Sequence, residues 1–467
     1  MSGMTRLSRV FSSPRVVATS FSLILIGASI LGLVATVLGH DYRVLTSSRL
    51  ARQRPVSVYP HMPVPGTSDV EGSEGAAGAD FSQVYTSGLA LRHGESAYNP
   101  TTPAYNDVFG RPPGYPPLMN WLYLPLTYLS YANALLVHTL AMLAALFAVS
   151  AFLLWKMQLP RQIAPVLLAQ ACLFLLTPIG FTHFERGQFD IYATIAAALC
   201  VACSYWPASA RGLALASGAI GALKWTVLPF LGCFTAFGFL VGPKSRRWTF
   251  FAIPLITAVT TALFYKEVKE YWHTIQVYEL EAVPNRLSLT FQHFVPRMVA
   301  KALPVVATLL PAIVIWAWKP ARARRDEMFR ALAVPFSLAL MNLSICFGTL
   351  SYEYHTVSTL GMLPGVVVWL ESEPHVSLRL KALTAGLYAA FLVVAFRIFE
   401  LAFALEPKQM SAVYAACALL LLGLCMQVIR GIGRRAVLDA QAQERSLDRR
   451  ERERRGEQHD RKTTVAM

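Results

Sequence analysis

Charged residues are scarce in this sequence. Asp, Glu, Lys and Arg together make up only 15% of the 467 residues, whereas a soluble domain carries about a quarter. Hydrophobic residues make up 55%, and the mean hydropathy is +0.44. Many apolar stretches approach the roughly 20 residues that a helix needs to cross a bilayer. The composition therefore excludes an ordinary soluble protein and indicates an all-α integral membrane protein.

The short motifs of metal, nucleotide and disulfide sites are also missing. The sequence has no H-E-x-x-H, no Walker-type lysine loop and no four-cysteine spacing. All seven cysteines lie inside apolar stretches, and the Cys200-x-x-Cys203 half-motif has no second half. Cysteines in this setting are expected to be small packing residues. We therefore expect no metal, no cofactor and no disulfide framework.

The net charge of +15 does not indicate a nucleic-acid partner, because the basic residues form no groove or patch in the sequence. They gather instead at the ends of apolar stretches, for example at 244–247 and 322–325. This distribution is typical of loops held on the cytoplasmic side of a membrane. Membrane lipids are expected partners of the chain, and its charged C-terminal tail could contact anionic lipids.

The apolar stretches predict about twelve spans with both termini in the cytoplasm. A cytoplasmic N-terminus (1–16) precedes the transmembrane domain (17–430), and a charged cytoplasmic tail (431–467) follows it. The tail could form a helix or stay disordered. Two external segments are expected, a large first loop at 40–117 and a second at 266–297.

The expected spans lie at about 17–39, 132–155, 163–182, 189–206, 248–265, 298–318, 328–350, 357–371, 381–404 and 412–430, with a pair inside 212–241. The stretch 212–241 has cytoplasmic charges on both sides, so it predicts two short passes or a re-entrant pair. Lys224 lies near its middle.

Asp80 stands among aromatic residues in the first external loop, in Ala79-Asp80-Phe81-Ser82-Gln83-Val84-Tyr85. An aspartate at the start of a helical segment is favoured as an N-cap. A carboxylate at the membrane surface could also accept a proton from an attacking sugar hydroxyl, as a general base. Both interpretations stay open from the sequence.

Lys224 is a second unusual residue, because a lysine inside an apolar stretch is costly to bury. Its side chain could extend to the membrane interface. Alternatively, the ammonium could bind a phosphate as a point charge.

Two short external links carry the remaining candidates. The first, 183–188, contains Arg186 and Gln188, and the second, 351–355, contains Tyr352 and His355. The tyrosines of the second link suit an interfacial aromatic belt, whereas Arg186 and His355 could contact phosphate or sugar. Asp190 lies one turn into the next span and could instead form an i, i+4 ion pair with Arg186.

Taken together, these segments resemble glycosyltransferase family 87, over most of residues 17–372. The resemblance is carried, in family order, by Asp80-Phe81-x-x-Val84-Tyr85, Tyr115-Pro116-Pro117-Leu118, Gly187-Gln188, Ala222-Leu223-Lys224-x-x-x-x-Pro229, Asn285 to Ser288 and Ser351-Tyr352-x-x-His355. The sequence departs from the family pattern in a long insert at about 55–79 and in Glu353-Tyr354.

The resemblance implies a polytopic GT-C-type helix bundle that takes a sugar, typically mannose, from a polyprenyl-phosphate donor on the external face. The acceptor would be a lipid or a glycan, and the anomeric carbon would usually be inverted. By position, Asp80 would be the general base, and Lys224, His355 and Arg186 would bind the carrier phosphate. The other candidate substrate contacts are Gln188, Asn285 and Tyr352.

A transporter or flippase for a lipid-linked or polar solute is the alternative class, and a membrane scaffold or assembly factor is a third. A transporter predicts internal repeats with matching broken helices, and the two halves of this chain show no convincing repeat. We therefore expect a glycosyltransferase of the cell envelope, in the plasma membrane of a bacterium.

Overall fold

The computed structural model describes residues 14–38, 78–102, 105, 113–177, 180, 183–184, 186–281, 289–348, 353–395 and 407–465. All the regular secondary structure in these segments is helical. The α-helices are α2 (Pro14–Leu38), α5 (Ala79–Arg92), α6 (Pro117–Tyr123), α7 (Tyr131–Lys156), α8 (Ile163–Leu175), α10 (Asp190–Tyr205), α11 (Ala210–Gly221), α12 (Leu228–Val241), α13 (Ala252–Leu263), α14 (Tyr265–Glu281), α15 (Arg297–Ala317), α16 (Lys319–Ala323), α17 (Arg325–Ile345), α18 (Met362–Ser372), α19 (Leu378–Ala395) and α21 (Pro407–Val465). The short 3₁₀ segments are η3 (Leu124–Tyr128), η4 (Pro160–Gln162), η5 (Trp225–Val227), η6 (Arg247–Phe251), η7 (Phe291–His293) and η8 (Glu353–Gly361).

Four helices of the described chain are long and apolar enough to cross a membrane. They are Tyr131–Lys156, Arg297–Ala317, Arg325–Ile345 and Lys408–Arg452. A fifth span results if Arg247–Leu263 and Tyr265–Gln276, which meet at a bend of 100°, count as one. The helical membrane architecture is thus confirmed, while the number of twelve spans stays a prediction.

Two helices, α10 and α17, form the centre of the bundle. Every residue of α10 except Tyr192 and Tyr205 is buried, and α10 packs against α7, α11, α17, α18 and η8. The alanines of α10 allow neighbouring backbones to approach closely, as small residues do in membrane bundles. The Ser217 hydroxyl of α11 donates a hydrogen bond to the Ala196 carbonyl oxygen at 2.8 Å, which ties α11 to this core.

The stretch 212–241 folds as the short pair that its charges predict. Helices α11 and α12 have 12 and 14 residues, so they are about 18 and 21 Å long, shorter than the roughly 30 Å hydrocarbon core. Gly221 ends α11 and Pro229 lies in the first turn of α12, where proline is tolerated. Lys224 lies in the break between them, with an extended backbone.

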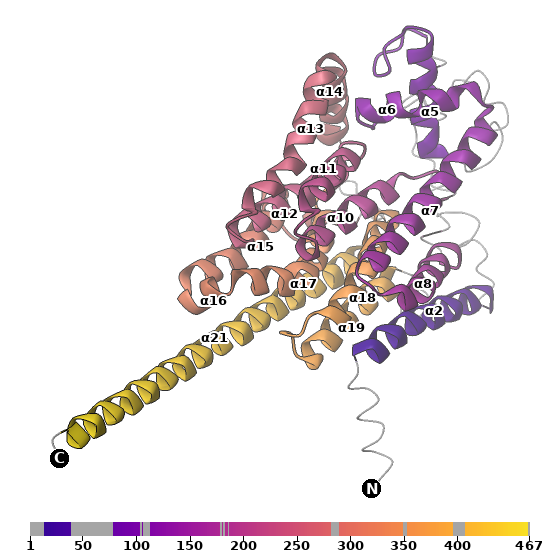
Figure 1. Ribbon diagram of the computed structural model, residues 1–467. Helices are drawn as coiled ribbons and strands as arrows, with labels where there is room; N and C mark the ends of the chain where they lie inside the picture. The colour runs from indigo at the N-terminus through magenta and orange to yellow at the C-terminus, as the bar shows by residue number, and fades with distance from the viewer. Residues whose placement is uncertain are drawn as a thin grey trace.

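Different helices form the two ends of the molecule. Helices α5, α6 and α14 lie at one end, and α21 runs out of the bundle beyond the other (Figure 1). Residues 266–281 of the predicted external segment belong to the helix α14, which begins at Tyr265. Helix α21 continues without a break from Pro407 to Val465, so the described part of the charged tail is helical and residue 430 is not a helix boundary.

Candidate functional site

Helix α5 is fixed at its start to the turn that precedes α10. Its N-cap is Gly78, so the interpretation of Asp80 as the N-cap is wrong, and Asp80 lies in the first turn of the helix. The backbone N–H of Asp80 donates to the carbonyl oxygen of Arg186 at 2.8 Å. A Cβ added at Gly187, whose φ is 62°, would stand 2.6 Å from the Cβ of Phe81. Helix α5 and the turn before α10 are therefore so close at this point that only glycine fits at position 187.

The Asp80 carboxylate is buried, at 5% exposure, and receives hydrogen bonds from the same turn. The Arg186 Nε donates to its Oδ2 at 2.7 Å, and the Gln188 side-chain amide donates to the same oxygen. Gln83, on α5 itself, lies 3.4 Å from Oδ1. Three candidates predicted from two separate segments, Asp80 from one and Arg186 and Gln188 from the other, are thus brought together.

The predicted i, i+4 ion pair of Arg186 with Asp190 is not formed. Helix α10 begins only at Asp190, so Arg186 lies in the preceding turn and not on the helix. The i, i+4 geometry needs both residues within helical backbone. Arg186 instead pairs with Asp80.

Asp190 is the centre of a second charged cluster. Its Oδ1 lies 3.7 Å from the Lys224 Nζ and 2.9 Å from the His355 Nδ1. Lys224 is 5% exposed, and its ammonium lies 4.9 Å from the ring centroid of Tyr115. Extension of Lys224 to the interface is therefore wrong, because its charge is paired inside the protein with a carboxylate and an aromatic face.

Close packing of η8 on α10 places His355 at this cluster. The Thr194 hydroxyl of α10 lies 3.2 Å from the carbonyl oxygen of Val357, to which it donates. A Cβ on Gly361 would stand 2.3 Å from the Thr194 side chain, so only glycine fits there. The contact sets the distance between His355 and the first residue of α10.

The two clusters are neighbours, because residues 186–190 contribute to both. Phe189, between Gln188 and Asp190, packs edge-on against Tyr115 with ring centroids 4.7 Å apart. Within the described residues, buried polar atoms at this junction have no hydrogen-bond partner: Oε1 of Gln188, Oδ2 of Asp190 and both ring nitrogens of His183. Buried polar groups are normally satisfied, so this junction has the properties of a binding site for a polar ligand.

Two predicted site residues, Asn285 and Tyr352, lie outside the described residues. The sequence interpretation in turn missed several residues at the junction. Gln83 accepts a hydrogen bond from the Gly114 N–H at 2.8 Å and so joins α5 to the segment before α6. His138 of α7 is hydrogen-bonded to Tyr123 at 2.8 Å and contacts the backbone of the 187–188 turn. A histidine inside an apolar helix is the signal that could have found it.

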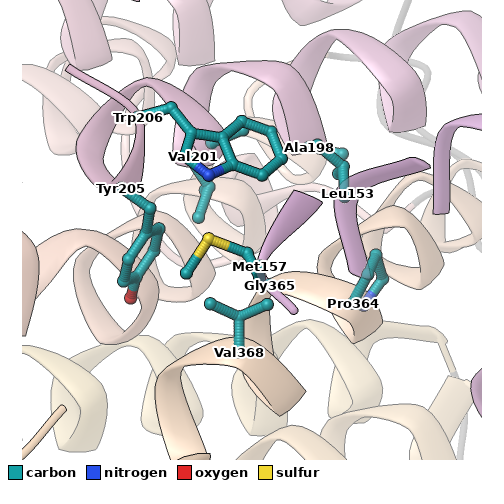
Figure 2. A pocket seen from close by; sticks show the side chains of 10 residues that line it. Leu153, Met157, Ala198, Val201, Tyr205, Trp206, Pro364, Gly365 and Val368 are labelled. Atoms are coloured by element: carbon teal, nitrogen blue, oxygen red, sulfur yellow. The ribbon is translucent and has the colours of Figure 1, made fainter. Parts of the chain in front are cut away.

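An apolar pocket lies at the other end of α10. It has a volume of about 260 Å³, part of it open to the outside. Figure 2 shows Trp206, Met157 and Val368 around it. From Asp190 to Tyr205, α10 extends about 22 Å, so this pocket is separate from the charged junction. Among the described residues, no group of three or more His, Cys, Asp or Glu side chains could hold a metal ion.

The sequence model described as Glycosyltransferase family 87 matches residues 114–347, half of the chain. The chain belongs to glycosyltransferase family 87. The matched segment contains Arg186, Gln188, Asp190 and Lys224 of the charged junction. No curated protein and no solved structure matches the chain. Family 87 membership identifies the protein as a membrane glycosyltransferase, and it favours the enzyme over the transporter and the scaffold.

Proposed function

We propose that this family 87 enzyme transfers a sugar from a polyprenyl-phosphate donor to a lipid or glycan acceptor, with Asp80 as the general base. The observation that carries the proposal is the pair of neighbouring clusters, one built on Asp80 and the other on Lys224 and His355. One offers a carboxylate to a hydroxyl, and the other offers cationic side chains to a phosphate. Transfer of a sugar from a phosphate oxygen to a hydroxyl oxygen needs both the carboxylate and the cationic side chains.

Asp80 suits the role of the base by its environment. It is buried, and Arg186 and Gln188 hold one of its oxygens in a fixed position. A base must lie within hydrogen-bond reach of the proton that it accepts, and a fixed carboxylate meets this requirement without reorganisation. In the proposed reaction, the acceptor hydroxyl oxygen attacks the anomeric carbon with inversion and gives its proton to Asp80.

Lys224 and His355 suit the departing phosphate. As the bond between the anomeric carbon and the phosphate oxygen breaks, negative charge develops on that oxygen, and preorganised cations stabilise it. Asp190 holds both side chains at one point, because each contacts its Oδ1. Arg186 adds a guanidinium from the adjoining cluster. Asn285 and Tyr352 stay candidate substrate contacts.

The proposed site faces the outside of the cell. The basic segments 244–247 and 322–325 favour cytoplasmic positions for their loops, and an even number of spans brings both termini to the same side. The site elements α5 and α6 lie at the end opposite to the projecting part of α21 (Figure 1). We propose a bacterial plasma membrane, a GT-C-type bundle and mannose as the sugar.

The test is a comparison of two carboxylate variants in isolated membranes supplied with polyprenyl-phosphate-linked mannose. Asp80→Asn keeps the shape of the side chain but removes the base, so we expect release of polyprenyl phosphate to fall by about 10²- to 10⁴-fold while the donor still binds. Glu267→Gln removes a carboxylate on a different helix, α14, and should leave release unchanged. Parental release by Asp80→Asn would show that the base is another group.

A further inference from the structure

His183 is a buried residue of the junction to which the proposed function gives no role. It lies in the turn between α8 and α10 and is 1% exposed. Its ring packs against Phe174 and Phe184, with centroids 6.0 and 5.6 Å away. Neither ring nitrogen has a hydrogen-bond partner among the described residues. A buried imidazole with both nitrogens unsatisfied is costly to fold, so an occupant of the site is expected to satisfy it.

The backbone fixes His183 relative to the candidate base. Its carbonyl oxygen accepts a hydrogen bond from the backbone N–H of Gln188 at 2.9 Å. The side chain of Gln188 in turn donates to Asp80. His183 and the Asp80 carboxylate are therefore held by one short turn.

The charges of both clusters act on His183. Burial is the largest cause and lowers the pKa of its imidazole from 6.5 to about 4, and the charges of the two clusters add smaller shifts in both directions. At neutral pH the side chain is therefore neutral, with one N–H donor and one nitrogen acceptor. The titratable groups that act on it come from five different elements: Asp190, Lys224, His355, Asp80 and His138.

The proposed reaction leaves a proton on Asp80 that has to depart before the next turnover. The leaving polyprenyl phosphate can take it, because a phosphate monoester has a second pKa of about 6. A neutral imidazole between a carboxylic acid and a phosphate can accept a proton at one nitrogen and donate one from the other.

We propose that His183 carries the proton from Asp80 to the departing phosphate. This inference rests on the proposed function. The acceptor O–H bond breaks and its proton goes to Asp80, while a new bond forms between the acceptor oxygen and the anomeric carbon. The bond from that carbon to the phosphate oxygen breaks. One imidazole nitrogen of His183 then takes the proton from Asp80, and the other gives its proton to a phosphate oxygen.

The step is balanced and needs no further reactant. Asp80 returns to the carboxylate, the phosphate leaves as its monoanion, and His183 is neutral again in its other tautomer. Proton exchange between the ring and water after the phosphate leaves restores the first tautomer. In this role His183 contacts the phosphate itself, so it is a catalytic residue and not a support for its neighbours.

The experiment measures proton uptake when the full-length protein, in detergent, binds farnesyl phosphate. Calorimetry at pH 8 in buffers of different ionisation enthalpy gives the number of protons bound with the ligand, and the free phosphate is then a dianion, since pH 8 is above its second pKa of about 6. We expect uptake of about one proton per bound ligand by the wild-type protein. His183→Gln should bind farnesyl phosphate with most of this uptake lost.

His375→Gln is the matched control, because His375 lies between α18 and α19, where it contacts Glu327 and no residue of the junction named above. It should show the wild-type uptake. Equal uptake by His183→Gln and the wild type would overturn the relay. The wild-type protein supplies a test that needs no variant: binding without proton uptake overturns the relay and leaves the proposed donor class intact. Failure of the wild type to bind farnesyl phosphate overturns both proposals.

Discussion

Substitution of Lys224 by methionine is the sharpest test of the charged junction. The change keeps the length and the apolar stem of the side chain but removes the charge that faces Asp190 at 3.7 Å. At this distance and an effective dielectric constant of about 20, the attraction between the two charges is about 4 kcal/mol. The substitution would leave Asp190, with a side chain only 2% exposed, as a buried carboxylate without its lysine. Breaking a buried pair in this way costs about 3 to 5 kcal/mol.

We therefore expect Lys224→Met to lower the free energy of unfolding by about 3 to 5 kcal/mol. Chemical unfolding of the detergent-solubilised protein measures this loss. Lys156→Met is the control, because Lys156 lies exposed at the end of α7. A change there should stay within about 0.5 kcal/mol.

The double variant Lys224→Met/Asp190→Asn separates folding from function. It has no unpaired charge, so most of the lost stability should return. Transfer activity should not return, because the ammonium proposed for the phosphate is still absent. An unchanged unfolding free energy of Lys224→Met would refute the buried ion pair. Full activity of the double variant would refute the phosphate role of Lys224.

Two further predictions concern the packing of the site and the pH dependence of stability. Gly361→Ala places a Cβ 2.3 Å from Thr194, so η8 must move away from α10. We expect kcat to fall and the KM for the donor to rise, because His355 loses its position. The KM for the acceptor, whose hydroxyl meets Asp80, should change less. Burial raises the pKa of Glu373 from 4.5 to about 7, so the folded state binds this proton more tightly than the unfolded state. The contribution of this proton to the free energy of unfolding is fully present below about pH 4.5. About 3 kcal/mol of it is lost as pH rises to about 7. Glu373→Gln should remove this slope from unfolding curves recorded between pH 4 and 8, and an identical slope in the variant would contradict the assignment.

The long helices could be predicted from the sequence because the membrane imposes a length on apolar stretches. The predicted spans at about 132–155 and 298–318 differ from α7 (131–156) and α15 (297–317) by only one residue at each end. The break at Lys224 could also be predicted from the membrane, because the hydrocarbon core penalises a lone charge. Family 87 membership, which the motifs suggested, is confirmed.

The pairing of the charged residues could not be predicted, because it depends on contacts between distant segments. Asp190 is 34 residues from Lys224 and 165 from His355, and only the packing of η8 and the α11–α12 break against α10 brings the three together. The i, i+4 rule applied to Arg186 failed because the helix starts four residues later than the rule requires. His183 gave no signal in the sequence, since its unusual property is burial without a partner.

The pairing of Lys224 with Asp190 has a consequence for the proposed mechanism. A site of unpaired cations would bind the phosphate tightly before and after the reaction, and equally tight binding of substrate and transition state does not accelerate the chemical step. Asp190 offsets part of the positive charge of Lys224 and His355 while it holds both side chains in place. The attraction to the phosphate is then greatest when the anomeric bond breaks and the oxygen gains its full charge. Removal of Asp190 alone, by Asp190→Asn, should therefore increase the affinity for farnesyl phosphate and lower the rate of transfer, and a variant with weaker product binding would contradict this account.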